Sequence, residues 1–222
     1  MRNATLDYAR LVAAIGILFF HSGAPGAWLG YAALPFFLML LVCLAWPAAQ
    51  REALGVYARS RMRRIMIPWV TWSLVYGGLK VIDAIVTGHP LATEFSQWMW
   101  LTGPAIHLWF LPFAFVSCLI LWPIAQAAKS VGVRVRLGFV VGCVSVALIV
   151  LLTGQDASFP TPLAQWAYAL PAVMLGIAFA ITRGFERRGL ASGGLWVATL
   201  GGMLLIGRVA GAEQLMVAAS AL

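Results

Sequence analysis

Charged residues are scarce in this sequence. Only 10% of its 222 residues are charged, and only seven are acidic, whereas 62% are hydrophobic. A soluble domain has about a quarter of its residues charged, so the composition excludes an ordinary soluble protein. It indicates a protein that is integrated in a membrane and surrounded by lipids.

Cysteine and histidine, the usual metal ligands and redox groups, are also rare. The three cysteines, Cys43, Cys118 and Cys143, all lie in apolar stretches and lack the spacing of a metal site. Their odd number argues against a disulfide framework, and we expect no metal. The net charge of +8 does not indicate a nucleic acid partner, because the basic residues stand in short clusters between apolar runs.

What the sequence has in abundance is long apolar runs. A membrane-spanning helix needs about 20 residues, and seven segments have or approach that length: 6–23, 28–47, 65–87, 105–127, 137–153, 163–182 and 194–210. We therefore predict an all-α, polytopic transmembrane helix bundle of about six or seven membrane helices, forming a single domain over residues 1–222. We expect the first segment to be retained rather than cleaved as a signal peptide, because Asp7 precedes it and Pro25 interrupts the best cleavage site.

The basic residues give these segments an orientation. If the segments alternate in direction, 13 of the 15 lysines and arginines fall on one side of the membrane. Because loops rich in Lys and Arg stay in the cytoplasm, the sequence predicts a cytoplasmic N-terminus.

Two ionisable residues in the first segment need an explanation, because such groups are costly inside a membrane. Arg10 and His21 are eleven positions apart. On a helix that spacing is about 16 Å along the axis and close to three turns, so the two positions share a face to within about 20°. The pair indicates either a polar track, with Arg10 at the cytoplasmic interface and His21 towards the outer half, or a snorkelling arginine and a histidine that marks the helix end.

A second polar feature is the stretch 59-RSRMRRIMIPW-69. Arginine clusters are common in cytoplasmic loops whatever the protein does, but guanidinium groups also pair with phosphate oxygens. Pro68 suits the first turn of the next helix, which would leave free backbone N–H groups beside the cluster. The stretch therefore indicates either an anion site or a simple topology signal.

Two further features lie on the predicted outer side. In 104-PAIHLWFLPF-113, His107 and Trp109 fit either a site on the same side as His21 or ordinary interfacial residues. Lys80 and Asp83, at positions i and i+3 of one helix, are expected to form a local ion pair.

Taken together, these motifs resemble those of the acyltransferase 3 family of integral membrane acyltransferases. The first segment, with Leu6-Asp7-Tyr8, Arg10 and His21, is similar to the family's Arg-x10-His signature. Arg61-x-x-Arg64-Ile65-x-x-Pro68 is similar to its Arg-x-x-Arg motif, and His107-Leu108-Trp109-Phe110-Leu111-Pro112 to its His-Leu-Trp-Phe-Leu stretch. The three motifs occur in the family's order, and the resemblance is strongest over residues 5–180.

The resemblance implies an acyltransferase of the bacterial inner membrane. Its donor would be cytoplasmic acyl-CoA, with acetyl as the commonest acyl group, and its acceptor a hydroxyl of a cell-surface or periplasmic glycan. Such a reaction is the O-acetylation by which bacteria modify surface polysaccharides.

The resemblance also implies roles for individual residues. His21 would be catalytic, acting as a general base or carrying the acyl group itself, and Arg10 would support it. Arg61 and Arg64 would bind the acyl-CoA. The implied substrate-binding residues are Asp7, His107 and Trp109.

The chain departs from the family's pattern in two places. Family members usually have more membrane helices than this chain has room for, so we expect the C-terminal helices to be missing. The second segment keeps Phe36 and Phe37 but lacks the Ser-Gly that commonly follows them. Two alternatives remain: a truncated, non-catalytic membrane scaffold, and a transporter or flippase, although no inverted repeat and few intramembrane carboxylates support the latter.

Overall fold

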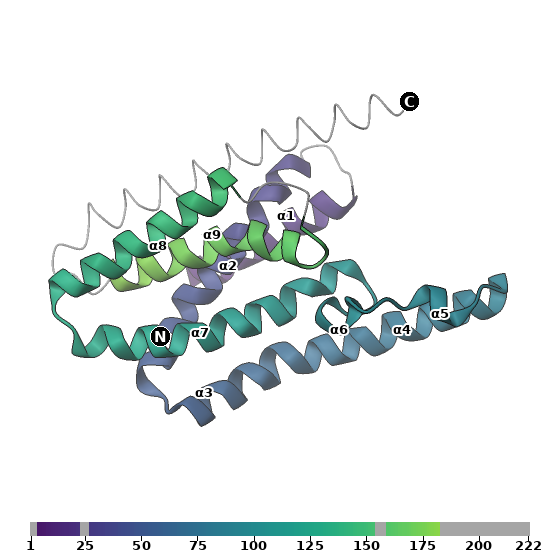
Figure 1. Cartoon of the computed structure of the whole chain (residues 1–222), viewed down its shortest axis with the longest axis horizontal. Coiled ribbons are helices and arrows are strands. Elements are labelled where there is room, and N and C mark those ends of the chain that lie inside the picture. The colour runs from purple at the N-terminus through teal and green to yellow at the C-terminus, as the bar shows by residue number, and fades with distance from the viewer. Residues whose placement is uncertain (1–3, 23–26, 154–158, 183–222) are drawn as a thin grey trace. The chain divides into compact units, whose positions relative to one another are not determined.

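The computed structural model describes residues 4–22, 27–153 and 159–182, and its regular elements in these ranges are all helices (Figure 1). In chain order they are α1 Ala4–Ser22, α2 Ala27–Arg51, α3 Leu54–Arg61, the π-helix η1 Met62–Met66, α4 Ile67–Thr87, α5 Leu91–Glu94, α6 Met99–Thr102, the 3-10 helix η2 Ile106–Trp109, α7 Phe110–Ser130, α8 Val133–Thr153 and α9 Leu163–Thr182.

The predicted all-α fold is confirmed. Within the described ranges there is no strand, and five helical stretches are long and apolar enough to cross a membrane. A shorter apolar stretch, Arg10–Phe19, lies in α1. Six of the seven predicted segments therefore coincide with helices, and the seventh, 194–210, lies outside the described residues.

The chain divides into two compact units. Unit 1 consists of the described residues within 1–44, 131–148 and 169–222. Unit 2 consists of those within 45–130 and 149–168. Unit 1 therefore contains α1, most of α2 and parts of α8 and α9, whereas unit 2 contains everything from the end of α2 to the end of α7.

The core of unit 1 forms where α2 and α9 pack closely. A Cβ atom at Gly176 of α9 would lie only 3.1 Å from Val42 Cβ and 3.2 Å from Met39 Cα. The Cys43 thiol also reaches the Gly176 carbonyl, at 3.8 Å. Small residues allow membrane helices to approach in this way, so the stretch that lacks the family's Ser-Gly packs against a glycine supplied by α9.

In unit 2, the long helices α4 and α7 are connected through shorter elements at their ends. At one end α3 and η1 contact α7, and at the other α4 contacts α5 and η2. Most large apolar side chains of α4 face outwards; Leu74 is 72% exposed and Val86 is 79% exposed. Such a surface suits a helix surrounded by lipid rather than by water.

Candidate functional site

One end of unit 2 carries the arginines and is here called the arginine end; it comprises residues 49–66 and the part of α7 from 118 to 129. Here α7 side chains bind backbone carbonyl groups at the end of α2 and just after it. Gln126 Nε2 donates to the Ala49 carbonyl at 2.7 Å, and Lys129 Nζ donates to the Gln50 carbonyl at 2.7 Å. Trp122 Nε1 donates to the Glu52 carbonyl at 3.0 Å. The last carbonyls of a helix have no partner within it, so these bonds fix the corner between α2 and α3.

Tyr57 and Arg61 stand one turn apart on α3. Tyr57 is fully buried, and the Arg61 guanidinium carbon lies 5.2 Å from the centroid of its ring. A cation within about 6 Å of a ring face is attracted by the ring's electrons. The Cys118 thiol of α7, also fully buried, lies close enough to Tyr57 to interact with it electrostatically.

The π-helix η1 interrupts the helical register between Arg61 and Arg64. The Ile67 N–H donates to the Met62 carbonyl, five residues back, which widens the turn. Arg61 is partly buried against Tyr57, whereas the Arg64 side chain is exposed. The structure thus brings the two motif arginines to one corner but gives them different surroundings.

The predicted free backbone N–H groups beside Pro68 are not found. Pro68 does lie in the first turn of α4. However, α3, η1 and α4 form one continuous stretch, Leu54–Thr87, in which the N–H groups of Met62 and Ile67 are already bonded within the helix. An anion at this corner would therefore depend on side-chain donors.

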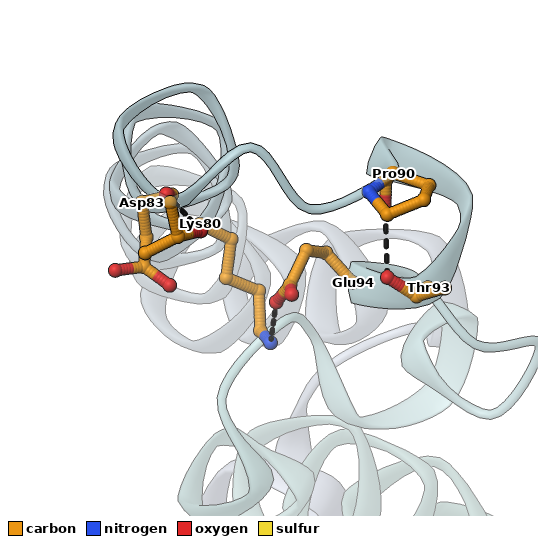
Figure 2. A network of polar contacts seen from close by, with 6 residues as sticks. Lys80, Asp83, Pro90, Thr93 and Glu94 are labelled. Atoms are coloured by element: carbon orange, nitrogen blue, oxygen red, sulfur yellow. Dashed lines mark hydrogen bonds and ion pairs between the residues drawn. The ribbon is translucent and has the colours of Figure 1, made fainter.

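The opposite end of unit 2, here called the loop end (residues 88–109), corrects a second prediction. Lys80 of α4 pairs with Glu94 of α5, with Nζ 3.3 Å from Oε2 (Figure 2). The Asp83 carboxylate points away from the Lys80 ammonium group in the same view. The predicted Lys80–Asp83 pair is therefore wrong, because the turn after α4 brings a better placed carboxylate to Lys80.

His107 and Trp109 occupy one 3-10 turn, η2, but differ in burial. His107 is exposed, and its ring meets the Tyr76 ring edge-on at a centroid distance of 5.0 Å. Trp109 is only 7% exposed and packs against Phe110 and Phe113. Of these two predicted substrate residues, His107 is the one with an accessible side chain.

The first predicted motif lies on α1, in unit 1. Because α1 runs from Ala4 to Ser22, Arg10 and His21 are on one continuous helix, as their spacing requires. Arg10 has an exposed side chain. The side chains of Asp7 and His21 lie outside the described part of the structure. The predicted path from the arginine end to His21 stays a prediction.

In the described ranges, no three His, Cys, Asp or Glu side chains gather as the ligands of a metal would. The three cysteines are buried and are not joined in disulfides.

Sequence reasoning missed several residues of the arginine end. Tyr57 was the one with a readable signal, because it stands four positions before Arg61, the spacing at which helical side chains meet. Trp122 and Gln126 carried no such signal, since their partners are 70 to 77 residues away in sequence.

Fold and site together define a polytopic helical membrane protein with an arginine-rich corner. A family model described as an acyltransferase domain matches residues 3–221, almost the whole chain. The chain belongs to this acyltransferase 3 family and is a membrane acyltransferase by that membership. No curated protein and no solved structure matches it.

Proposed function

We propose that this protein transfers an acyl group, acetyl foremost, from cytoplasmic acyl-CoA to a hydroxyl group of a cell-surface or periplasmic glycan. It would do so in the bacterial inner membrane, with its N-terminus in the cytoplasm. The family supplies the reaction type, and the chain's own residues support the choice of donor.

The observation that carries the proposal is the arginine end. Three arginines are exposed there, Arg59, Arg63 and Arg64. The guanidinium group of Arg61 lies over the ring of the buried Tyr57. Coenzyme A carries several phosphate groups, and guanidinium groups bind phosphate through charge-assisted hydrogen bonds. An arginine cluster that served topology alone would not need the corner that Trp122 and Gln126 fix through backbone carbonyls.

In this proposal α1 supplies the reacting group. A neutral His21 imidazole would accept the proton of the acceptor hydroxyl as that oxygen attacks the thioester carbonyl, or would itself carry the acyl group in an intermediate. Its position about 16 Å along the helix from Arg10 suits the extended pantetheine arm of the donor. On the outer side, His107 and Trp109 would contribute to acceptor binding, with His107 as the accessible contact and the buried Trp109 holding the turn. Asp7, near the cytoplasmic start of α1, would be a further substrate-binding residue.

The test is acetyl incorporation in a host that lacks surface-glycan acetylation. We expect the wild-type chain to add acetyl groups and His21→Ala to lose about 10²- to 10⁴-fold of that activity, the usual contribution of a general acid–base residue. His89→Ala, an exposed histidine in the turn after α4, is the matched control and should retain activity. Activity that survives in His21→Ala would contradict the catalytic assignment, and activity in none of the three would favour a non-catalytic scaffold.

A further inference from the structure

We infer that Tyr57 is a positioning residue that holds Arg61 ready for the phosphate groups of the acyl donor. Donor binding would then depend on an aromatic ring that lies outside the Arg-x-x-Arg motif. The inference rests on the proposed function for the identity of the ligand, but the contact itself is between two residues of this chain.

The ring of Tyr57 is a fixed support. Its side chain is fully buried, as are Cys118 and Leu121 of the neighbouring α7. The corner around it is anchored by the Trp122 and Gln126 side chains. Because side chains in a close-packed interior move little, the Tyr57 ring offers Arg61 one position rather than a range of positions.

The contact leaves the donors of Arg61 available. The guanidinium group lies over the ring face, 5.2 Å from its centroid, so the attraction does not consume its N–H groups. Arg61 Nε is buried and has no hydrogen-bond partner among the described residues, so it is covered by protein and does not itself face a ligand. An anion would bind the terminal amino groups of the guanidinium group, which the ring contact holds in one place.

The other arginines of the cluster are not held in one position in this way. The side chains of Arg59, Arg63 and Arg64 are exposed, so each must lose rotamer freedom when it binds a phosphate group. Arg61 has already lost much of that freedom in the unbound protein, and pre-ordered groups bind more tightly for this reason. Tyr57 would therefore contribute to affinity without touching the donor.

The experiment measures the affinity of coenzyme A for the purified full-length chain in lipid nanodiscs. We expect Tyr57→Leu, which removes the ring, to weaken binding about 5- to 30-fold, the range of a partly desolvated cation–π contact. Tyr57→Phe, which restores the ring without the hydroxyl, should recover the affinity to within about twofold. Trp72→Leu is the matched control, because this α4 ring is half exposed and should not affect binding.

A double-mutant cycle separates positioning from a general folding defect. If Tyr57 acts through Arg61, Tyr57→Leu should weaken binding no further in an Arg61→Ala background. In an Arg64→Ala background it should still cause its full loss. Equal losses in both backgrounds would mean that the substitution acts through the fold, and the inference would be wrong.

The outcomes also distinguish this inference from the proposed function. If the wild-type chain and Tyr57→Leu bind coenzyme A equally well, the positioning role is overturned while the proposed function stands. If the wild-type chain binds no coenzyme A, the donor assignment fails and the inference fails with it. The Arg61 Nε–H resonance of selectively labelled protein reports on the ring contact without any ligand, and an unchanged shift in Tyr57→Leu would contradict the contact.

Discussion

The two ends of unit 2 fix their polar groups by different means. At the arginine end, α7 side chains bind carbonyl groups of residues 70 to 79 positions away, and the arginines remain available. The loop end combines tight local turns, with Gly103 in a conformation that favours glycine and Thr102 bonded to Trp98, with contacts to α4 such as the Lys80–Glu94 pair. The arginine end is thus held by hydrogen bonds between segments far apart in sequence, whereas the loop end is held by its turns and by close packing of these turns on the preceding helix.

The largest effect is expected at the loop end, for Gly103→Ala. Gly103 has φ of 81° and ψ of 174°, a region that is strained for other residues. A Cβ atom there would also lie 2.7 Å from Ser73 Oγ and 3.0 Å from Leu108 Cδ1. We expect a loss of about 2–4 kcal/mol in unfolding free energy, measured by denaturation of the purified protein in detergent.

Gly88→Ala is the matched control for this substitution. Gly88 also has positive φ, 74°, but nothing lies within 4 Å of where its Cβ atom would be. The expected loss is about 1–2 kcal/mol, from backbone strain alone. Equal losses for the two variants would show that the packing of Gly103 against Ser73 and Leu108 does not hold the loop end.

A smaller effect is expected at the arginine end, for Gln126→Leu. The substitution removes the bonds to the Ala49 and Gln50 carbonyls, at 2.7 and 3.3 Å, and leaves those groups without these partners. We expect a loss of about 1–2 kcal/mol in the same denaturation experiment. Gln97→Leu, at an exposed position of the loop end, should change the stability little. A Gln126→Leu variant as stable as Gln97→Leu would mean that the tertiary bonds are not what fixes this end.

The smallest effect is expected for the ion pair of the loop end. Lys80 and Glu94 are 32% and 19% exposed, so Glu94→Gln should reduce the unfolding free energy by only about 0.5–1 kcal/mol. Asp83→Asn should leave the stability unchanged, because Asp83 points away from Lys80 (Figure 2). The opposite result, a loss for Asp83→Asn alone, would restore the pairing that sequence spacing suggested.

The helices were predictable because hydrophobicity and length decide them in a membrane. Six of the predicted segments coincide with helices, since each is apolar over about 20 residues and a membrane permits little but helix for such a run. The bounds of α3 and η1 were not predictable, because the apolar pattern of the sequence does not mark where a continuous helix changes to a π-turn.

The placement of a motif was predictable where all its residues lie on one helix, and not where residues distant in sequence meet. Arg10 and His21 lie on one helix, α1, and Arg61 and Arg64 lie in one continuous helical stretch, while the roles assigned to these residues stay predictions. Two errors came from neighbours that sequence spacing cannot show. Lys80 pairs with the carboxylate of Glu94, 14 residues away, rather than with Asp83. The helix also continues through a π-turn into Pro68, so the backbone N–H groups before Pro68 are bonded within the helix.

The proposed function depends on acyl-CoA binding at the arginine end, and binding measurements on three chains test it. They compare the coenzyme A affinity of wild type, Arg64→Ala and Arg134→Ala at matched membrane insertion, with Arg134 serving as an exposed arginine of α8 outside the cluster. Loss of charged hydrogen bonds to phosphate should weaken binding by Arg64→Ala about 10- to 100-fold and leave Arg134→Ala at the wild-type affinity. Equal affinity in all three would contradict acyl-CoA binding at the arginine end and leave Arg64 as a topology signal.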